Sequence, residues 1–354
     1  MVKKLIIKKA LTDKEISEKE GHYFDESHYK LVIKEDTDVY ILDTYNPRKM
    51  DESNLLLSFR KKVFTLNECK NAFKALEKHS QKKHNNRGSA AGLLKTDELP
   101  NYVKETTDTT KFRAYYIGKD GTRKKDHISN YVKSGIIGYF DRYDRNIFNK
   151  KYQENKKTKE GQEMQEIQDN RVKQEKPIPC RMTQFTRDEV EKWKMATPLI
   201  ESADKIFKKL VPDRHQKQLE RARETPDYKI SDTAFSTVTI NYNYQTATHK
   251  DKGDYEDGFG NLIVLEKSKC QSGAPDYKGG YLGFPQYKVC VDIRQGDFIA
   301  MNVHEWHCNT PISSGCVVSN SNNNIKNNEK SKTIDYGRLS MVCYLRKNMI
   351  KCKK

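Results

Sequence analysis

The sequence contains no long apolar run. No segment approaches the roughly 18 consecutive apolar residues that a membrane-spanning helix needs. The N-terminal stretch MVKKLIIKKALTDKE has too short an apolar core for a signal peptide. Hydrophobic residues make up only 35% of the 354 residues, so some segments are solvated rather than core. The sequence therefore predicts a soluble intracellular protein, nuclear or cytoplasmic, without a membrane partner.

Metal-binding and disulfide frameworks built on cysteine are absent too. The chain has eight cysteines but no C-x-x-C pair, and their spacing is not that of a small disulfide-rich domain. This excludes a zinc ribbon and an iron–sulfur cluster of the usual spacing. We therefore expect reduced thiols.

Acidic residues are in deficit. The 66 Lys and Arg residues outnumber the 49 Asp and Glu residues, which gives a net charge of +17. Such a surplus favours an acidic partner, nucleic acid first and anionic membrane surfaces second. A proteome that is generally rich in lysine would give the same balance, so charge alone does not identify the partner.

The chain divides into a short N-terminal part and one long domain. Residues 1–60 mix short apolar runs with charges and are expected to be an extension with extra strands, ahead of a domain over 61–354. Residues 63–82 have helical spacing, with Thr65 as the N-cap. Two polar stretches interrupt the domain: a charged insertion at 149–178 and a low-complexity loop at 313–334.

The C-terminal half is rich in short strands. Two helices are expected before Ala234, the second with Thr197 as its N-cap and Pro198 at its first position. Six β-rich runs then follow: FSTVTINYNY, LIVLEK, GGYLGFPQY, YKVCVDI, GDFIAMNV and RLSMVCYL. This pattern predicts an α+β protein in which a β-sandwich or jelly roll has helices packed outside it.

One histidine and one aspartate stand two residues apart after the first of these runs. Because side chains alternate along a strand, His249 and Asp251 are expected on one face. The segment GDFIAMNVHEWHCNTP supplies His304 or His307 as a third ligand. Two histidines and one carboxylate make the facial triad of non-haem Fe(II) oxygenases. The alternative for His249 and Asp251 is a hydrogen-bonded pair at a strand end.

A buried cation is expected on a later strand. Arg338 begins the run RLSMVCYL, where it can hold a carboxylate inside the barrel. In the 2-oxoglutarate-dependent branch of these oxygenases the far carboxylate of the co-substrate needs a fixed cation, and arginine can bind it through two parallel hydrogen bonds. The order His-x-Asp, His, Arg fits that branch.

The succession FSTVT, HKD, HCNTP and RLSMVCYLRKNM resembles the TET/JBP oxygenases, which oxidise the methyl group of 5-methylcytosine or thymine in nucleic acid. The stretches NRGSAAG, SGIIGYFDR and GGYLGFP are similar to the JBP-like, viral or microbial members. The resemblance covers roughly residues 180–350 and, more loosely, 60–145. The Cys-rich zinc-binding region of the animal enzymes has no counterpart. The fold that it implies is a double-stranded β-helix, a cupin-like jelly roll flanked by helices.

The resemblance also implies the cofactor set. Fe(II) would be held by His249, Asp251 and His307, because His307 is followed by the Thr-Pro turn that the family has after its distal histidine. The co-substrate 2-oxoglutarate would be held by Arg338 and Ser340, the family's Arg-x-Ser pair, and O₂ would be the oxidant.

Three further residues match base-contacting positions of the family. Asp254 stands where TET enzymes have an asparagine that touches the target base. A carboxylate that only accepts suits the exocyclic amine of cytosine, but thymine N3–H can also donate to it, so the base stays open. Tyr344 matches the stacking tyrosine, with a core aromatic as the alternative, and Arg346 falls where TET enzymes have a histidine.

The expected function is hydroxylation of the 5-methyl group of a pyrimidine in nucleic acid, DNA rather than RNA, by a monomeric enzyme. The target base would be flipped out or already single-stranded, because a methyl group inside a duplex cannot reach a buried iron. Two alternatives stay open: a lysyl or prolyl protein hydroxylase with the same iron chemistry, and a nucleic-acid-binding module without catalysis.

Overall fold

The computed structural model describes residues 2–98, 110–117, 123–141, 180–267, 277–314 and 335–352. The predicted charged insertion at 149–178 and residues 315–334 of the predicted low-complexity loop lie outside these ranges.

Ten strands form the major sheet, in the order β1-β3-β4-β15-β11-β18-β10-β8-β5, with β9 beside β8. Their bounds are β1 Lys3–Ile7, β3 Thr37–Ile41, β4 Leu55–Arg60, β5 Lys83–His84, β8 Val132–Phe140, β9 Arg181–Met182, β10 Thr237–Tyr242, β11 Gly260–Glu266, β15 Phe298–Met301 and β18 Arg338–Tyr344. A minor sheet has the order β16-β13-β14-β2. It consists of β2 Leu31–Ile33, β13 Leu282–Phe284, β14 Val289–Val291 and β16 Cys308–Asn309.

The chain alternates between the two sheets from β10 onward. It passes from β10 and β11 of the major sheet to β13 and β14 of the minor sheet, then to β15, β16 and β18 in turn. This winding is that of a jelly roll and confirms the predicted double-stranded β-helix. All six predicted β-runs form strands, as does part of SGIIGYFDR, within β8. Two short pairs complete the β-structure: β6 Ala114–Ile117 with β7 Arg123–Ile128, and β12 Tyr277–Gly279 with β17 Ile312–Ser314.

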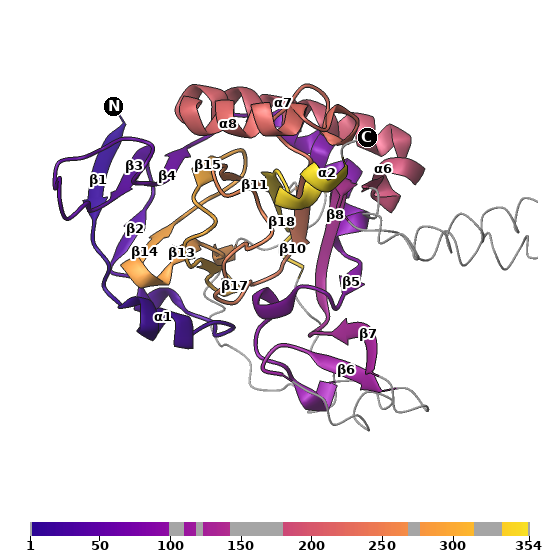
Figure 1. Ribbon diagram of the computed structural model, residues 1–354, viewed down its shortest axis with the longest axis horizontal. Coiled ribbons are helices and arrows are strands. Elements are labelled where there is room, and N and C mark those ends of the chain that lie inside the picture. Colours follow the sequence, from indigo (N-terminus) through magenta and orange to yellow (C-terminus); the bar gives the residue numbers. More distant parts are fainter. Residues whose placement is uncertain are drawn as a thin grey trace, which may run out of the picture.

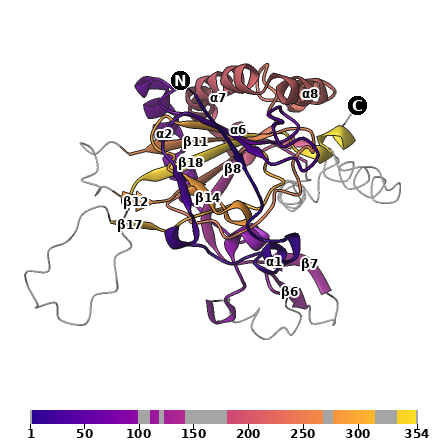
Figure 2. The ribbon, with the colours of Figure 1, turned by 90° about the vertical axis from the view of Figure 1, so that its left-hand side faces the viewer.

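Helices cover the outer face of the major sheet. Figures 1 and 2 show α7 and α8 lying along one side of the molecule, above the strands. The α-helices are α1 Asp13–Glu18, α2 Leu66–Ser80, α6 Gln184–Asp188, α7 Val190–Leu210 and α8 Pro212–Arg223. Short 3₁₀ helices lie at η1 Glu26–His28, η2 Gly88–Ala91, η3 Thr96–Glu98, η4 Pro226–Tyr228, η5 Pro285–Tyr287 and η6 Lys347–Cys352.

The helix predicted over 63–82 is α2. Its N-cap is Thr65, whose hydroxyl accepts a hydrogen bond from the Glu68 N–H (3.2 Å) while the Glu68 carboxylate accepts from the Thr65 N–H (2.8 Å). This capping box satisfies two backbone donors that a helix start leaves unpaired. Phe73 and Leu76 are buried on the face that packs against the sheet and α7.

The predicted helix start at Thr197 is wrong. Residues 190–210 form one helix, α7, with Pro198 inside it. Thr197 donates its hydroxyl to the Trp193 carbonyl (2.8 Å) instead of capping a new helix. An internal proline costs ~3 kcal/mol. Burial of Leu199, Ile200 and Phe207 on the same helix contributes about 1.5–3 kcal/mol for each side chain, which outweighs that cost.

Two apolar clusters occupy the two faces of the major sheet. On the outer face Ile240, Met341 and Ile263 pack with residues of α2 and α7. On the inner face Leu262 and Ile299 pack with the minor sheet. The alternation of side chains along each strand therefore divides one core into a helix-covered layer and a layer between the sheets.

Residues 1–60 contribute strands to both sheets. β4 pairs antiparallel with β15 of the major sheet, and β2 pairs parallel with β14 of the minor sheet. The segment is thus hydrogen-bonded into the jelly roll; a domain boundary at residue 60 stays a prediction.

The expectation of reduced thiols is wrong for two cysteines. Cys180 and Cys352 form a disulfide between positions 172 residues apart. Chain folding brings them together, and no local spacing indicates such a contact. Cys69, Cys290, Cys308 and Cys343 are free and buried.

Within the described ranges, no helix is both long and apolar enough to cross a bilayer.

Candidate metal centre and its cavity

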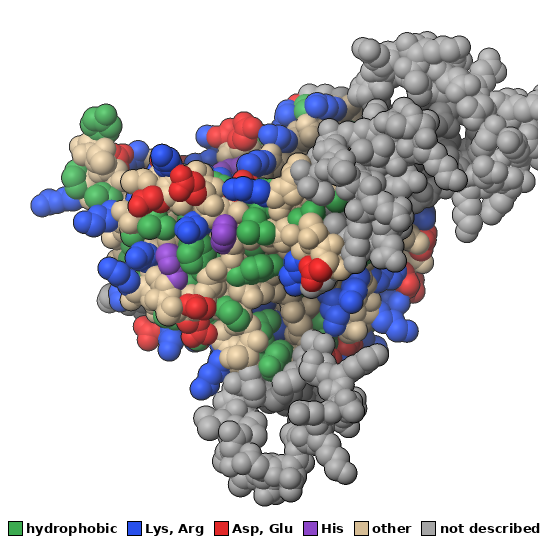
Figure 3. All heavy atoms as spheres, turned by 90° about the horizontal axis from the view of Figure 1, so that it is seen from below, with side chains coloured by type: hydrophobic (Ala, Val, Ile, Leu, Met, Phe, Trp, Pro, Cys, Tyr) green, Lys and Arg blue, Asp and Glu red, His purple; other side chains and the backbone are tan. Residues whose placement is uncertain are grey.

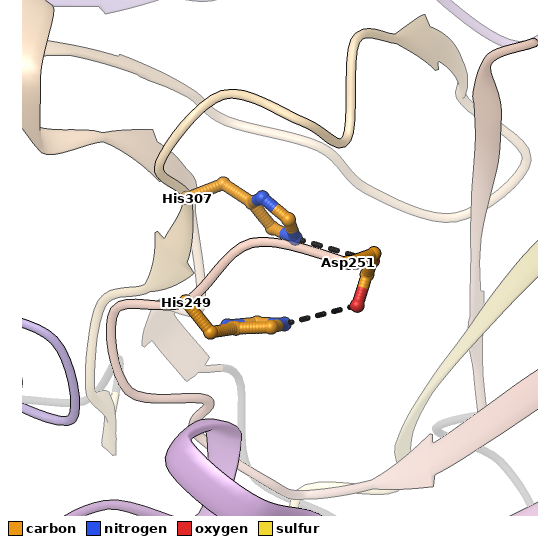
Figure 4. A group of neighbouring side chains, drawn as sticks. All are labelled: His249, Asp251 and His307. Atoms are coloured by element: carbon orange, nitrogen blue, oxygen red, sulfur yellow. Dashed lines mark ion pairs between the residues drawn. The ribbon is translucent and has the colours of Figure 1, made fainter. Parts of the chain in front are cut away.

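His249, Asp251 and His307 converge on one point (Figure 4). The Asp251 carboxylate lies 3.7 Å from His249 Nε2 and 3.5 Å from His307 Nε2, and one donor atom from each residue lies within 4.8 Å of the other two. These distances fit one ion bound between the three groups. The structure thus brings together the three residues that the sequence predicts as ligands.

The two histidines are held by a backbone bridge rather than by the end of β10. His249 N–H donates to the His307 carbonyl and His307 N–H to the His249 carbonyl, both at 3.0 Å. This isolated bridge sets His249 beside His307, which directly precedes β16 of the minor sheet. The two rings consequently lie next to each other, with centroids 4.3 Å apart.

Both imidazole rings are oriented by their own backbone. His249 Nδ1 lies 2.7 Å from the Ala247 carbonyl, and His307 Nδ1 lies 2.9 Å from the Glu305 carbonyl. In this pairing Nδ1 carries the proton and donates it, so the lone pair of each neutral ring is at Nε2. A backbone carbonyl behind a metal-binding imidazole fixes its tautomer and orientation in this way.

The charges of the cluster also suit a cation. Burial, and then the neighbouring His307, lowers the pKa of His249 to about 4, so its ring is neutral near pH 7. Burial would raise the pKa of Asp251, but the two neighbouring imidazoles, His307 first, outweigh burial and hold that pKa below its usual range. Burial would likewise lower the pKa of His307, but the same contact with Asp251 outweighs burial and raises it. A neutral imidazole and an ionised carboxylate are the forms that bind metal ions.

His304, the other candidate for the third ligand, lies outside this group. Its Nε2 is 3.2 Å from the Tyr255 carbonyl. It is not one of the three residues whose donor atoms converge.

Arg338 and Ser340 lie two residues apart on the inner face of β18. Arg338 is 2% exposed; one of its Nη groups donates to the Gly280 carbonyl (2.8 Å), and its Nε has no hydrogen-bond partner. An unpaired donor on a buried guanidinium is costly. A carboxylate bound beside it would satisfy that donor, so the arrangement fits the far carboxylate of 2-oxoglutarate. Ser340 lines the cavity described below.

Gly280 leaves the space for this arginine. Its φ of +67° suits glycine, and a Cβ atom there would lie 3.1 Å from Arg338 Nε. A larger residue at position 280 would therefore crowd the side of the guanidinium that lacks a partner.

The three predicted base contacts, Asp254, Tyr344 and Arg346, line the cavity described in the next paragraph. Tyr344 and Arg346 also have hydrogen-bond or ion-pair partners within the protein. Tyr344 shares a hydrogen bond with the Thr239 hydroxyl (3.1 Å), and Arg346 pairs with Asp141 (2.7 Å). Burial, and then the nearby Asp251, raises the pKa of Asp254 well above its usual range. A carboxyl that is protonated donates as well as accepts, so the base that Asp254 would contact stays a prediction left open.

A cavity of about 510 Å³ joins the metal cluster, Ser340 and the three predicted base contacts; Arg338 is not among its lining residues. Besides the predicted residues its wall contains side chains that the sequence analysis does not assign to the site: Asn86, Arg87, Thr110, Phe112, Arg113, Thr239 and Asn241. Asn86 and Arg87 belong to the stretch NRGSAAG, whose similarity to JBP-like members was a signal for this part of the wall. Thr110, Phe112 and Arg113 had no such signal.

The family model for Tet_JBP, the oxygenase domain of the 2OGFeDO superfamily, matches residues 169–347, just over half of the chain. The chain belongs to this family. The matched part contains His249, Asp251, His307 and Arg338, and it ends one residue after Arg346. The superfamily is that of the 2-oxoglutarate- and iron-dependent dioxygenases, which use O₂. The Arg87 and Arg113 wall of the cavity lies outside the matched residues.

Curated relatives carry the same domain within longer chains. Thymine dioxygenase JBP1 of Trypanosoma brucei brucei is 31% identical over 170 residues, which is 48% of this chain and 17% of that protein. The bifunctional helicase and thymine dioxygenase JBP2 of Trypanosoma brucei brucei (strain 927/4 GUTat10.1) is 33% identical over 171 residues, 47% of this chain and 13% of that protein. The chain therefore spans less than a fifth of the length of these relatives.

Among solved structures, NgTET1 in complex with 5mC DNA superposes with a TM-score of 0.44 at 10% identity, over 96% of this chain and 92% of that chain.

Proposed function

We propose that this protein is an Fe(II)- and 2-oxoglutarate-dependent dioxygenase that hydroxylates the 5-methyl group of a pyrimidine in DNA. The observation that carries the proposal is the His249–Asp251–His307 cluster in a cavity that Ser340 also lines, two residues along β18 from a buried arginine, Arg338, with an unpaired donor. The family membership and the names of the thymine dioxygenase relatives support the substrate class.

Iron bound with 2-oxoglutarate would supply O₂ activation and the oxidation of an unactivated C–H bond. The residues of the chain hold and orient the reactants. His249 and His307 present Nε2 lone pairs, and Asp251 presents a carboxylate oxygen, all toward one point. Three ligands from one side leave the opposite positions for co-substrate and oxygen. One chain supplies all three, which supports the proposal that a monomer is active.

Arg338 would hold the far carboxylate of 2-oxoglutarate, assisted by the Ser340 hydroxyl. Both residues are buried, so the charge-assisted hydrogen bonds form away from competing water. The result is a fixed orientation of the co-substrate across the inner face of β18.

The target base would lie against Tyr344, with Asp254 and Arg346 at its edge. Base–aromatic stacking contributes ~1–3 kcal/mol. It thereby offsets part of the cost of about a few kcal/mol for taking a base out of the duplex. Tyr344 is already oriented by Thr239, so little side-chain freedom is lost on stacking.

The test is incubation of the protein with Fe(II), 2-oxoglutarate, O₂ and oligonucleotides that contain 5-methylcytosine or thymine. Nucleoside mass spectrometry is expected to detect a 5-hydroxymethyl pyrimidine and succinate in equal amounts. His307→Gln should abolish both products, whereas His304→Gln, the matched change three residues earlier, should retain them. Hydroxylation of basic peptides without any oxidised base would overturn the DNA assignment and favour the protein hydroxylase.

A further inference from the structure

The rim of the cavity is rich in cations. Among the cavity-lining residues that reach solvent, Arg87, Arg113, Lys250, Lys252 and Arg346 are basic, and on the same rim Glu20 is acidic. Arg346 is paired with Asp141. Asp251 and Asp254 belong to the centre described above. Figure 3 shows Lys and Arg side chains on the face seen from below, the side toward which β6 and β7 project in Figure 1.

Two of these cations come from a segment upstream of the matched family domain. Arg113 lies against Gly88: a Cβ on Gly88 would be 3.2 Å from its guanidinium, and the φ of +55° at Gly88 also favours glycine. Arg87, the residue before Gly88, has a buried Nε without a hydrogen-bond partner. The backbone at Gly88 thus brings two guanidinium groups to one side of the rim.

Lys250 also lines the cavity and stands in the chain between two of the proposed metal ligands, His249 and Asp251. Its ammonium group lies 5.1 Å from the centre of the Trp306 ring, which precedes His307. Lys252 is 3.6 Å from Glu20 and so has an acidic partner. Within the described chain, no carboxylate lies within ion-pair distance of Arg87, Arg113 or Lys250, although Arg87 is close enough to Asp251 to help lower the pKa of that carboxyl. None of the three cations is therefore held in a direct ion pair there.

Charges of one sign that face a common opening repel one another and attract an anion. Phe112 lines the cavity beside Arg113 and offers an apolar face. Cations interleaved with an aromatic ring are typical of nucleic-acid strands, in which phosphates and bases alternate. An acidic peptide would satisfy the charges but would make no use of that ring.

We propose that Arg87, Arg113 and Lys250 bind the phosphates on either side of the target nucleotide. The strand would then cross the rim past these three side chains, with the target base directed toward the metal centre. This inference rests on the proposed action on DNA, and it assigns strand binding in part to two residues, Arg87 and Arg113, that the matched family domain does not include.

The test uses metal-free full-length protein, so that binding is measured without turnover. Fluorescence anisotropy gives the Kd of a labelled single strand and of its duplex at a series of KCl concentrations. Each cation that contacts a phosphate adds about 0.7 (single strand) or 0.9 (duplex) to the slope of log Kd against log salt. Arg87→Gln, Arg113→Gln and Lys250→Gln should each lower the slope by roughly that amount, and the triple variant by about three times as much.

Two controls separate phosphate binding from a structural role. Lys74→Gln removes an exposed lysine of α2, on the helix-covered side of the major sheet, and should leave the slope unchanged. Arg113→Lys keeps the charge and should restore most of the slope that Arg113→Gln loses.

Three results would overturn the inference: an unchanged slope in the triple variant, an equal loss in Lys74→Gln, or competition by polyglutamate as strong as competition by DNA of equal charge. A protein that shows the predicted slopes but oxidises no base would instead refute the proposed function alone.

Discussion

The two faces of strands β10 and β18 contrast sharply. Toward the helices they present Ile240 and Met341, which are fully buried in an apolar cluster. Toward the cavity the neighbouring positions are Thr239, Asn241 and Ser340, which are also buried but polar. The outer face therefore supplies stability, and the inner face keeps polar groups available for a ligand.

Unpaired polar atoms sharpen this contrast. Asn241 Oδ1 and Arg338 Nε, both on the inner face, are buried without hydrogen-bond partners. Such groups destabilise the free protein, since each loses water without a replacement. On β10 and β18 these unpaired atoms lie on the inner face, where a bound molecule could complete the hydrogen bonding, although Asn261 Oδ1 of β11 is also unpaired.

The largest effect is expected at the metal cluster. Asp251→Ala removes the one anionic ligand, and Fe(II) affinity should fall at least ~100-fold, because even residues behind a ligand change affinity by about 10–100-fold. Anaerobic calorimetric titration with Fe(II) measures this. Asp257→Ala, an exposed aspartate six residues later, is the matched control and should bind Fe(II) as the wild type does. Equal affinity in Asp251→Ala would exclude this residue as a ligand.

A change on the outer face should affect stability and leave the chemistry intact. Ile240→Ala opens a cavity in the helix-covered cluster and should lower the free energy of unfolding by ~2–5 kcal/mol. Thr239→Val, the adjacent change on the inner face, removes only the hydrogen bond to Tyr344 and should cost about 1 kcal/mol. Urea denaturation compares the two. The contrast between the faces fails if the two variants lose equal stability.

The Cys180–Cys352 disulfide links η6, which follows Tyr344 and Arg346 in the chain, to the residue directly before β9. Closing so long a loop stabilises the folded chain by ~2–4 kcal/mol. Reductant should therefore lower the Tm of the wild type, and Cys352→Ser should have that lower Tm with or without reductant. A wild-type Tm that does not respond to reductant would show that the pair contributes nothing to stability.

The smallest of these effects concerns co-substrate affinity. Arg338→Gln replaces a charged donor by a neutral one, and loss of a charge-assisted hydrogen bond costs about 1.5–3 kcal/mol. The Kd for 2-oxoglutarate should rise roughly 10- to 150-fold, measured by the charge-transfer absorption of the anaerobic Fe(II) complex. Fe(II) affinity without 2-oxoglutarate should not change. A loss of both affinities would indicate a structural role for Arg338 instead.

Local pattern was sufficient for much of the fold. The six β-runs, the capping box at Thr65 and the ligand trio were all readable, because alternation, capping chemistry and ligand type are properties of short segments. The Thr197-Pro198 pair led to a wrong prediction for the same reason, because it is a strong local signal for the start of a helix. The burial of Leu199 and Phe207 in the α7 interface, which overrides that signal, depends on distant residues.

Composition, residue order and short-range spacing by themselves predicted a β-sandwich or jelly roll, the His-x-Asp pair with His304 or His307 as candidate metal ligands, and an arginine on a later strand. Only the tertiary structure decided that His307 rather than His304 lies beside His249 and Asp251, that Arg87 and Arg113 line the same cavity, and that Cys180 forms a disulfide with Cys352. The reason is physical: each of these depends on contacts between residues far apart in the chain, and such contacts follow from the packing of whole sheets rather than from any local preference.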